Sequence, residues 1–146
     1  MINFIPLTLH LTSLTIEIMK IKKILLAEDD QDIREVIVEV LLNENFEVDW
    51  AENGLEATKK LATNSYDLLV SDFRMPKMDG AQLLSWCREN KIHFPVIFIT
   101  ANRELFPQEI LALNDCCASL LNKPLNIENL LQEIIKAEQR DHLRNC

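Results

Sequence analysis

Residues 67–80 have the sequence DLLVSDFRMPKMDG, which places a carboxylate at the end of a buried strand. The apolar run 68–70 leads to Asp72, and a proline-containing loop with a turn at Asp79–Gly80 follows. Ligands of an open α/β sheet gather outside the carboxyl ends of its strands. A lone Asp at that place is weak support for a site, because carboxylates often only cap a loop. Its meaning depends on whether other strands bring partners to the same edge.

Short apolar segments alternate with amphipathic ones along residues 23–136. The first helix carries Ile33, Val36 and Ile37 at the spacing of one buried stripe, and Asp30 and Asn126 are predicted helix N-caps. Five strand–helix repeats predict an α/β fold with a parallel sheet covered on both faces. Strands are predicted at 23–27, 46–51, 68–70, 95–100 and 119–121, and helices at 31–41, 55–61, 81–89, 106–113 and from 127 onward.

Length and composition predict one globular domain. The chain has 146 residues, 48% of them hydrophobic, and a formal net charge of -8. That charge argues against binding of a nucleic-acid backbone as the main role. The four cysteines match no zinc-binding spacing and indicate reduced thiols in a cytoplasmic protein. They are Cys87, Cys116, Cys117 and Cys146.

The first 18 residues are apolar and contain no Lys or Arg. They lack the basic start and the cleavage site of a secretory signal, and Pro6, His10 and Glu17 interrupt the run needed for a membrane span. Two interpretations stay open. Either Met19 is the true start, or residues 1–18 are an extra element that packs on the domain or on a partner. A membrane role is the least favoured.

Polar side chains end four of the predicted strands. They are Glu28 and Asp29, then Asp72, Thr100 and Lys123. Neighbouring strands lie about 4.8 Å apart, so these side chains can converge. Three carboxylates at one place raise one another's pKa, and a divalent cation relieves the conflict. Oxygen ligands suit Mg²⁺, whereas the lack of His or Cys near the strand ends disfavours zinc.

Such an arrangement predicts phosphoryl transfer. An Asp carboxylate can act as a nucleophile and form an aspartyl phosphate, and the protein then has to align and neutralise the phosphoryl group. Mg²⁺ would join Asp72 to one phosphoryl oxygen. Lys123 would neutralise a second oxygen, and Thr100 with a backbone amide would donate to the third.

Residues from about 23 to 136 resemble a response-regulator receiver domain of two-component signalling. The matching segments are ILLAEDD (24–30), DLLVSDFRMPKMDG (67–80), PVIFITA (95–101) and NKP (122–124), in the family's order and spacing. The resemblance implies the flavodoxin-like receiver fold, a doubly wound five-stranded parallel sheet in the order 2-1-3-4-5. We therefore expect residues 19–146 to form a single receiver domain without an output domain.

The resemblance also assigns roles within the site. It implies that Asp72 is the phospho-acceptor and that Asp29, Asp72 and the main-chain carbonyl of Arg74 bind Mg²⁺ directly. Glu28 would act mostly through a metal-bound water, and Thr100 and Lys123 would contact the phosphoryl group. The bond between Lys123 and Pro124 is expected to be cis, which only an X–Pro bond adopts readily.

Two positions depart from the family pattern. Leu120 stands three residues before Lys123, where many receivers have Tyr or Phe, and Cys116–Cys117 replaces a usual Gly-Ala. These departures put the usual conformational readout in doubt but leave the phosphorylation chemistry complete.

The resemblance implies a switch in a phosphorelay. A sensor kinase or phosphotransfer protein would donate a phosphoryl group from a phosphohistidine to Asp72. The new charge would shift a conformational equilibrium that controls an effector protein. Phosphorylation could also lead to a homodimer. We expect no direct contact with nucleic acid or membrane. We also expect no enzymatic activity beyond Mg²⁺-dependent self-phosphorylation and autodephosphorylation.

Three alternatives stay open. The chain could be a pseudo-receiver that binds partners without accepting phosphate. It could also be the receiver fragment of a longer hybrid kinase or DNA-binding regulator. A Mg²⁺-dependent phosphohydrolase is disfavoured, because Arg74 stands where such enzymes have an Asp as general acid.

Overall fold

The computed structural model describes residues 19–113 and 118–144, so the predictions for residues 1–18 and for Cys116–Cys117 lie outside the described residues. Within them, five strands pair in parallel in the order β2-β1-β3-β4-β5, which confirms the predicted doubly wound sheet. The strands are β1 (Lys23–Ala27), β2 (Glu47–Ala51), β3 (Leu68–Asp72), β4 (Val96–Thr100) and β5 (Ala118–Asn122). The helices are α2 (Gln31–Asn43), α3 (Gly54–Thr63), α4 (Gly80–Glu89), α5 (Gln108–Leu113) and α6 (Ile127–Arg144), with a 3-10 turn η1 (Arg103–Leu105).

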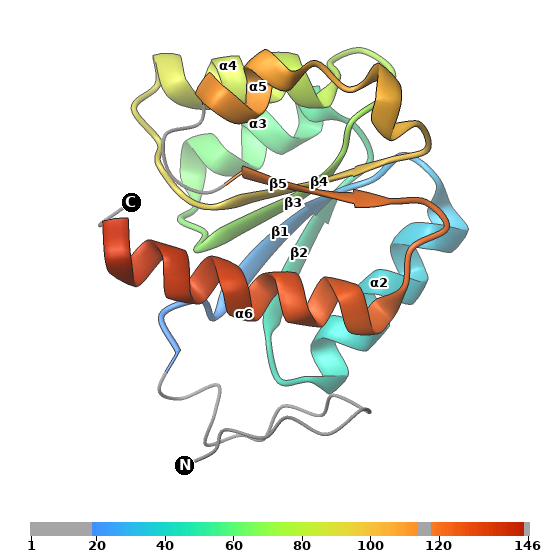
Figure 1. The fold of residues 1–146 in the computed structure, drawn as a ribbon, viewed down its shortest axis with the longest axis vertical. Helices are drawn as coiled ribbons and strands as arrows, with labels where there is room; N and C mark the ends of the chain where they lie inside the picture. Colours follow the sequence, from blue (N-terminus) through green and yellow to red (C-terminus); the bar gives the residue numbers. More distant parts are fainter. Residues whose placement is uncertain (1–18, 114–117, 145–146) are drawn as a thin grey trace.

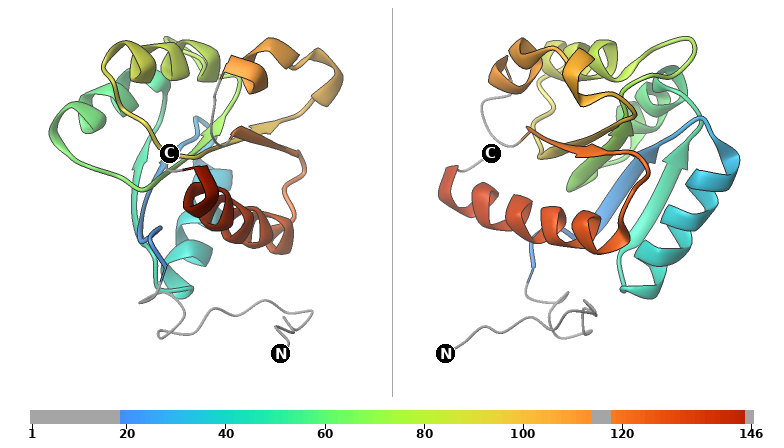
Figure 2. Two further views of the ribbon diagram at one scale, coloured as in Figure 1. Left: turned by 60° about the vertical axis from the view of Figure 1, so that its left-hand side comes forward. Right: turned by 45° about the vertical axis from the view of Figure 1, so that its right-hand side comes forward.

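Helices cover both faces of the sheet. Figures 1 and 2 show α2 and α6 on one face and α3, α4 and α5 on the other. Each face has its own apolar cluster, one around Ile24, Ile37 and Ile134 and the other around Leu25 and Phe98. Every residue of the central strands β3 and β4 is buried, as expected of parallel strands with helices on both sides.

The buried face of α2 differs from the predicted stripe. Arg34, Ile37 and Leu41 are buried, whereas Val36 is 54% exposed, so its prediction as a core residue is wrong. The side of α2 that carries Val36 lines an open groove next to α6 instead of packing against another element. The predicted N-cap is confirmed, because the Asp30 side chain accepts a hydrogen bond from the main-chain N–H of Ile33.

The helix predicted from 106 to 113 begins later than expected and spans Gln108–Leu113. The turn η1 comes first, Phe106 is extended and buried, and α5 begins only at Gln108. Pro107 is the physical reason, because a proline disfavours helical backbone in the residue before it.

Helix α6 continues past the predicted stripe and ends at Arg144. Its N-cap Asn126 is confirmed by a hydrogen bond from the main-chain N–H of Asn129. The carboxylate of Glu138 accepts hydrogen bonds from the main-chain N–H groups of Lys20 and Ile21 at 2.9–3.0 Å. The last helix therefore holds the segment that leads into β1. None of the helices in the described part of the chain combines the length and the apolar character needed to cross a membrane.

Candidate functional site

The sheet brings the predicted site residues to one edge. Asp72 and Thr100 are the last residues of β3 and β4, and Glu28 follows β1 directly. The pairing of Ala27 with Ser71 in the β1–β3 ladder sets Glu28 beside Asp72. Lys123 follows β5 and its main-chain N–H bonds to the carbonyl of Thr100. Parallel register, which aligns the carboxyl ends of the strands, thus produces the convergence.

Three carboxylates lie within reach of one ion. Ligand oxygens of Glu28, Asp29 and Asp72 all lie within 4.8 Å of one another. Glu28 and Asp72 are buried, whereas Asp29 is exposed. Lys123 Nζ lies 2.9 Å from Asp72 Oδ2 and 3.6 Å from Glu28 Oε1. The lysine therefore offsets part of the negative charge, and one cation faces three acids.

Burial and charge shift the ionisation of this group. Burial of Glu28, with the nearby charge of Asp72, raises the pKa of its carboxyl to about 7. Burial alone would lower the pKa of Lys123, but its hydrogen bond to Asp72 and the charge of that carboxylate raise it above its usual value. The site thus favours a protonated Glu28 or an additional cation.

The donor set fits Mg²⁺. Glu28 Oε2 accepts a hydrogen bond from the main-chain N–H of Asp30, but its buried Oε1 has no hydrogen-bond partner among the described residues. A buried carboxylate oxygen without a partner is costly, and a hydrated hard cation would satisfy it. The available ligands are oxygens, as Mg²⁺ prefers.

A cavity of about 280 Å³ opens over the acids. Asp29, Asp72, Arg74, Thr100 and Lys123 all line it, so the predicted residues surround one space, with Glu28 buried beneath them. The Thr100 hydroxyl accepts a hydrogen bond from the main-chain N–H of Asn102 at 3.2 Å. The bond between Lys123 and Pro124 is cis, as expected.

The loop after Asp72 is held by close backbone packing. The N–H of Gly80 donates to the carbonyl of Phe73 at 2.8 Å. A Cβ at Gly80 would lie 3.0 Å from the carbonyl oxygen of Asp72, and one at Gly54 would lie 2.4 Å from that of Met78. Glycine at both positions lets the loop lie against the end of β3 and the start of α3.

Aromatic side chains pack beside the acceptor although the fifth strand has none. Leu120 is buried. The ring of Phe73, the residue after Asp72, lies 4.5 Å from the ring of Phe106, and both lie within 6.0 Å of Phe98. The place of Phe106 in this cluster was not predicted from the sequence. The signal available in the sequence was an aromatic residue directly before Pro107, in the segment that follows β4.

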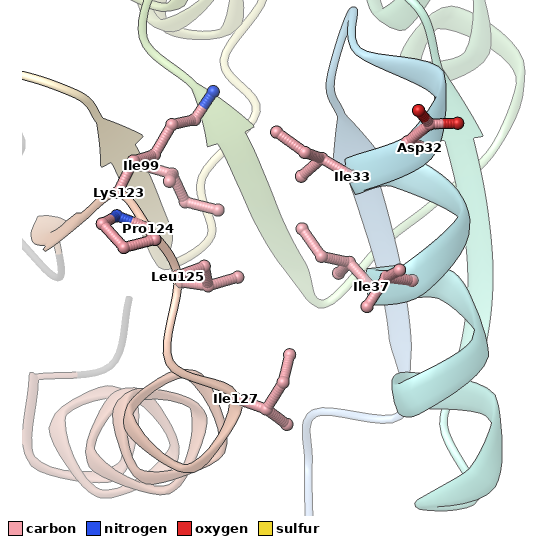
Figure 3. Close-up of a pocket in the computed structure, with 9 residues that line it drawn as sticks. Asp32, Ile33, Ile37, Ile99, Lys123, Pro124, Leu125 and Ile127 are labelled. Atoms are coloured by element: carbon pink, nitrogen blue, oxygen red, sulfur yellow. The ribbon is translucent and has the colours of Figure 1, made fainter.

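A second, apolar cavity adjoins the acidic one. It has a volume of about 350 Å³ and lies between α2 and the segment from Lys123 to Ile127. Figure 3 shows Ile33 and Ile37 on one side of it and Leu125 and Ile127 on the other. Lys123 lines both cavities, so this apolar groove begins at the acidic site.

One residue that contacts the site, Arg34, was not predicted from the sequence. Arg34 of α2 is 9% exposed, and its Nη1 donates to the main-chain carbonyl of Glu28 at 3.0 Å. A charged side chain three residues before the buried Ile37 was the only signal in the sequence.

Comparison with known proteins identifies the class. A model described as the response regulator receiver domain matches residues 24–135. The chain is 37% identical over 117 residues to the response regulator receiver protein CpdR of Brucella abortus, covering 79% of this chain and 95% of that protein. The chain belongs to the response-regulator receiver family.

Longer relatives and solved structures agree with this membership. The chain is 36% identical over 124 residues to the probable transcriptional regulator ycf29 of Porphyra purpurea, covering 84% of this chain but only 59% of that protein. It spans 55% of the response regulator ArlR of Staphylococcus saprophyticus. A solved structure of TrrA from Thermotoga maritima, in complex with Mg(2+)-BeF, is 31% identical and superposes with a TM-score of 0.70 over 80% of this chain and 99% of that one.

Proposed function

We propose that this receiver is a phospho-accepting switch whose acceptor is Asp72. A carboxylate oxygen of Asp72 attacks the phosphorus of a phosphohistidine on a sensor kinase or phosphotransfer protein. The new bond joins that oxygen to phosphorus, and the phosphorus–nitrogen bond breaks and leaves the histidine ring with the donor protein. The convergence of three acids and one lysine around the cavity at Asp72 carries this proposal.

Each side chain has a task in that reaction. Asp29, Asp72 and the main-chain carbonyl of Arg74 would hold Mg²⁺, with Glu28 acting through a metal-bound water. When bound, the ion supplies positive charge to a phosphoryl oxygen. Lys123, now 2.9 Å from Asp72 Oδ2, would transfer its hydrogen bond to a second phosphoryl oxygen. Thr100 would donate its hydroxyl proton to the third.

The surroundings support a protein donor and a signalling role. The apolar groove beside Lys123 offers a protein a surface next to the acceptor. The relatives are named response or transcriptional regulators, which supports control of an effector protein rather than turnover of a substrate. The same proposal includes three further points. Residues 19–146 form a single domain, the protein is cytoplasmic, and it forms a homodimer on phosphorylation.

Labelling with acetyl phosphate tests the chemistry. Wild-type protein with Mg²⁺ should gain about 80 Da in intact mass, the mass of one phosphoryl group, and should gain nothing when EDTA removes the metal. Asp72→Asn should abolish the adduct. Asp32→Asn, which removes an exposed carboxylate in the first turn of α2, should retain it.

The alternatives give different results. A pseudo-receiver would stay unlabelled with Mg²⁺ present, and labelling that persists in Asp72→Asn would contradict the assignment of the acceptor. Rapid turnover of a phosphomonoester would instead support a phosphohydrolase.

A further inference from the structure

The main chain of Glu28 lies just beyond the pairing of the central strands. The last pair of the β1–β3 ladder is Ala27 with Ser71. The N–H of Glu28 donates to the carbonyl of Ala51 at the end of β2. Its carbonyl oxygen accepts from Arg34 Nη1 at 3.0 Å. That carbonyl belongs to the peptide bond between Glu28 and Asp29, so its orientation sets where the Asp29 backbone begins.

Arg34 reaches this carbonyl beneath an aromatic ring. Its guanidinium carbon lies 4.3 Å from the centre of the Trp50 ring, and Lys60 Nζ lies 5.7 Å from the same centre. Arg34 is 9% exposed, whereas Trp50 remains 43% exposed. The guanidinium thus lies over the ring, and a cation in this position is stabilised by the aromatic face.

Trp50 has its position because β2 is an edge strand. Side chains alternate along a strand, so Val48, which packs against the cluster between the sheet and α2, shares its face with Trp50. The same face carries Arg34 on α2. Trp50 therefore links the edge of the sheet, through one side chain, to the peptide that joins the two acids.

We propose that Arg34, held against the ring of Trp50, is a positioning residue for Mg²⁺ binding at Glu28 and Asp29. This inference rests on the proposed function, because it assumes that the three acids bind Mg²⁺. Arg34 would not touch the ion. It fixes the peptide that orients two of the acids, and such outer contacts typically change metal affinity about 10- to 100-fold when they are removed.

Calorimetric titration of the metal-free full chain with MgCl₂ tests the inference. Arg34→Lys keeps the positive charge but loses the planar group that can stack and donate together, and it should weaken Mg²⁺ binding at least about 10-fold. Trp50→Leu should weaken it by a factor of about 3 or more, whereas Trp50→Phe, which keeps a ring face, should restore most of the affinity. Trp86→Leu on α4 is the matched control and should bind Mg²⁺ as wild type does.

Thermal unfolding without metal separates positioning from simple stabilisation. If the stack only stabilises the fold, Arg34→Lys and Trp50→Leu lower the melting temperature but bind Mg²⁺ with wild-type affinity, and the inference is overturned. Equal loss of affinity in Trp50→Phe and Trp50→Leu would also overturn it. If wild-type protein does not bind Mg²⁺ at all, the proposed metal site fails, and the inference fails with it.

Discussion

Glu28 is a carboxylate that the sheet buries completely beside a second acid. It is 0% exposed, and one of its oxygens has no hydrogen-bond partner among the described residues. Burial and the charge of Asp72 raise its pKa from 4.5 to about 7. The folded protein therefore holds a proton at Glu28 under conditions in which the unfolded chain has lost it. At the residue scale, the two neighbouring carboxylates repel each other when no metal is bound, and a proton or a cation relieves that repulsion.

The pH dependence of stability should show this strain in metal-free protein. Folding raises the pKa of Glu28. Its contribution to the free energy of unfolding is therefore fully present below about pH 4.5 and is lost as the pH rises through about 7. Between about pH 5 and about pH 8, wild type should lose up to about 3 kcal/mol of unfolding free energy relative to Glu28→Gln, whose side chain does not titrate. Urea unfolding in EDTA measures both proteins, and parallel profiles would contradict the shift.

At the scale of elements, contacts made by loops and by the last helix hold the segments that precede and follow the strands. The glycines at 54 and 80 let the loop after Asp72 lie against its neighbours. At the opposite end of the sheet, Glu138 on α6 accepts the N–H groups of Lys20 and Ile21. Ile21 is 1% exposed, so its N–H depends on that carboxylate. The last helix therefore contributes to the stability of the first strand.

Removal of this contact should destabilise the fold. Glu138→Ala leaves the buried N–H of Ile21 without its partner and should cost about 1–3 kcal/mol of unfolding free energy. Glu138→Gln keeps an accepting oxygen and should cost less. Gln132→Ala, an exposed change on the same helix, serves as the control in chemical denaturation. If Glu138→Ala and Gln132→Ala unfold at the same denaturant concentration, α6 does not hold the start of β1 in this way.

The sequence predicted those strands and helices whose burial can be recognised from a continuous run or a regular spacing of apolar residues. β3 and β4 are buried on both faces and appear as continuous apolar runs, so the meeting of Asp72 and Thr100 at their carboxyl ends could be predicted from the sequence. Val36 was misplaced, because its exposure depends on how far α6 lies from α2. Arg34 was missed, because its burial depends on Trp50, which arrives from another strand. Contacts between distant segments are the part that spacing along one helix does not determine.

At the scale of the whole molecule, two apolar clusters enclose one sheet, and the polar chemistry is confined to one edge of it. The sequence similarity extends over 95% of the length of CpdR and over 59% of the length of ycf29. The fold sets the position of the site, and the side chains that line its cavity determine its chemistry.

Chemical mapping of the phosphorylated residue shows which carboxylate accepts the phosphoryl group. Borohydride reduces an aspartyl phosphate, the covalent intermediate expected here, to homoserine, and peptide sequencing by mass spectrometry then locates it. After treatment with acetyl phosphate and Mg²⁺, we expect homoserine at position 72 and an unmodified Asp29. Homoserine at another position, or its absence from wild-type protein labelled in the presence of Mg²⁺, would contradict the assignment of Asp72 as the phospho-acceptor.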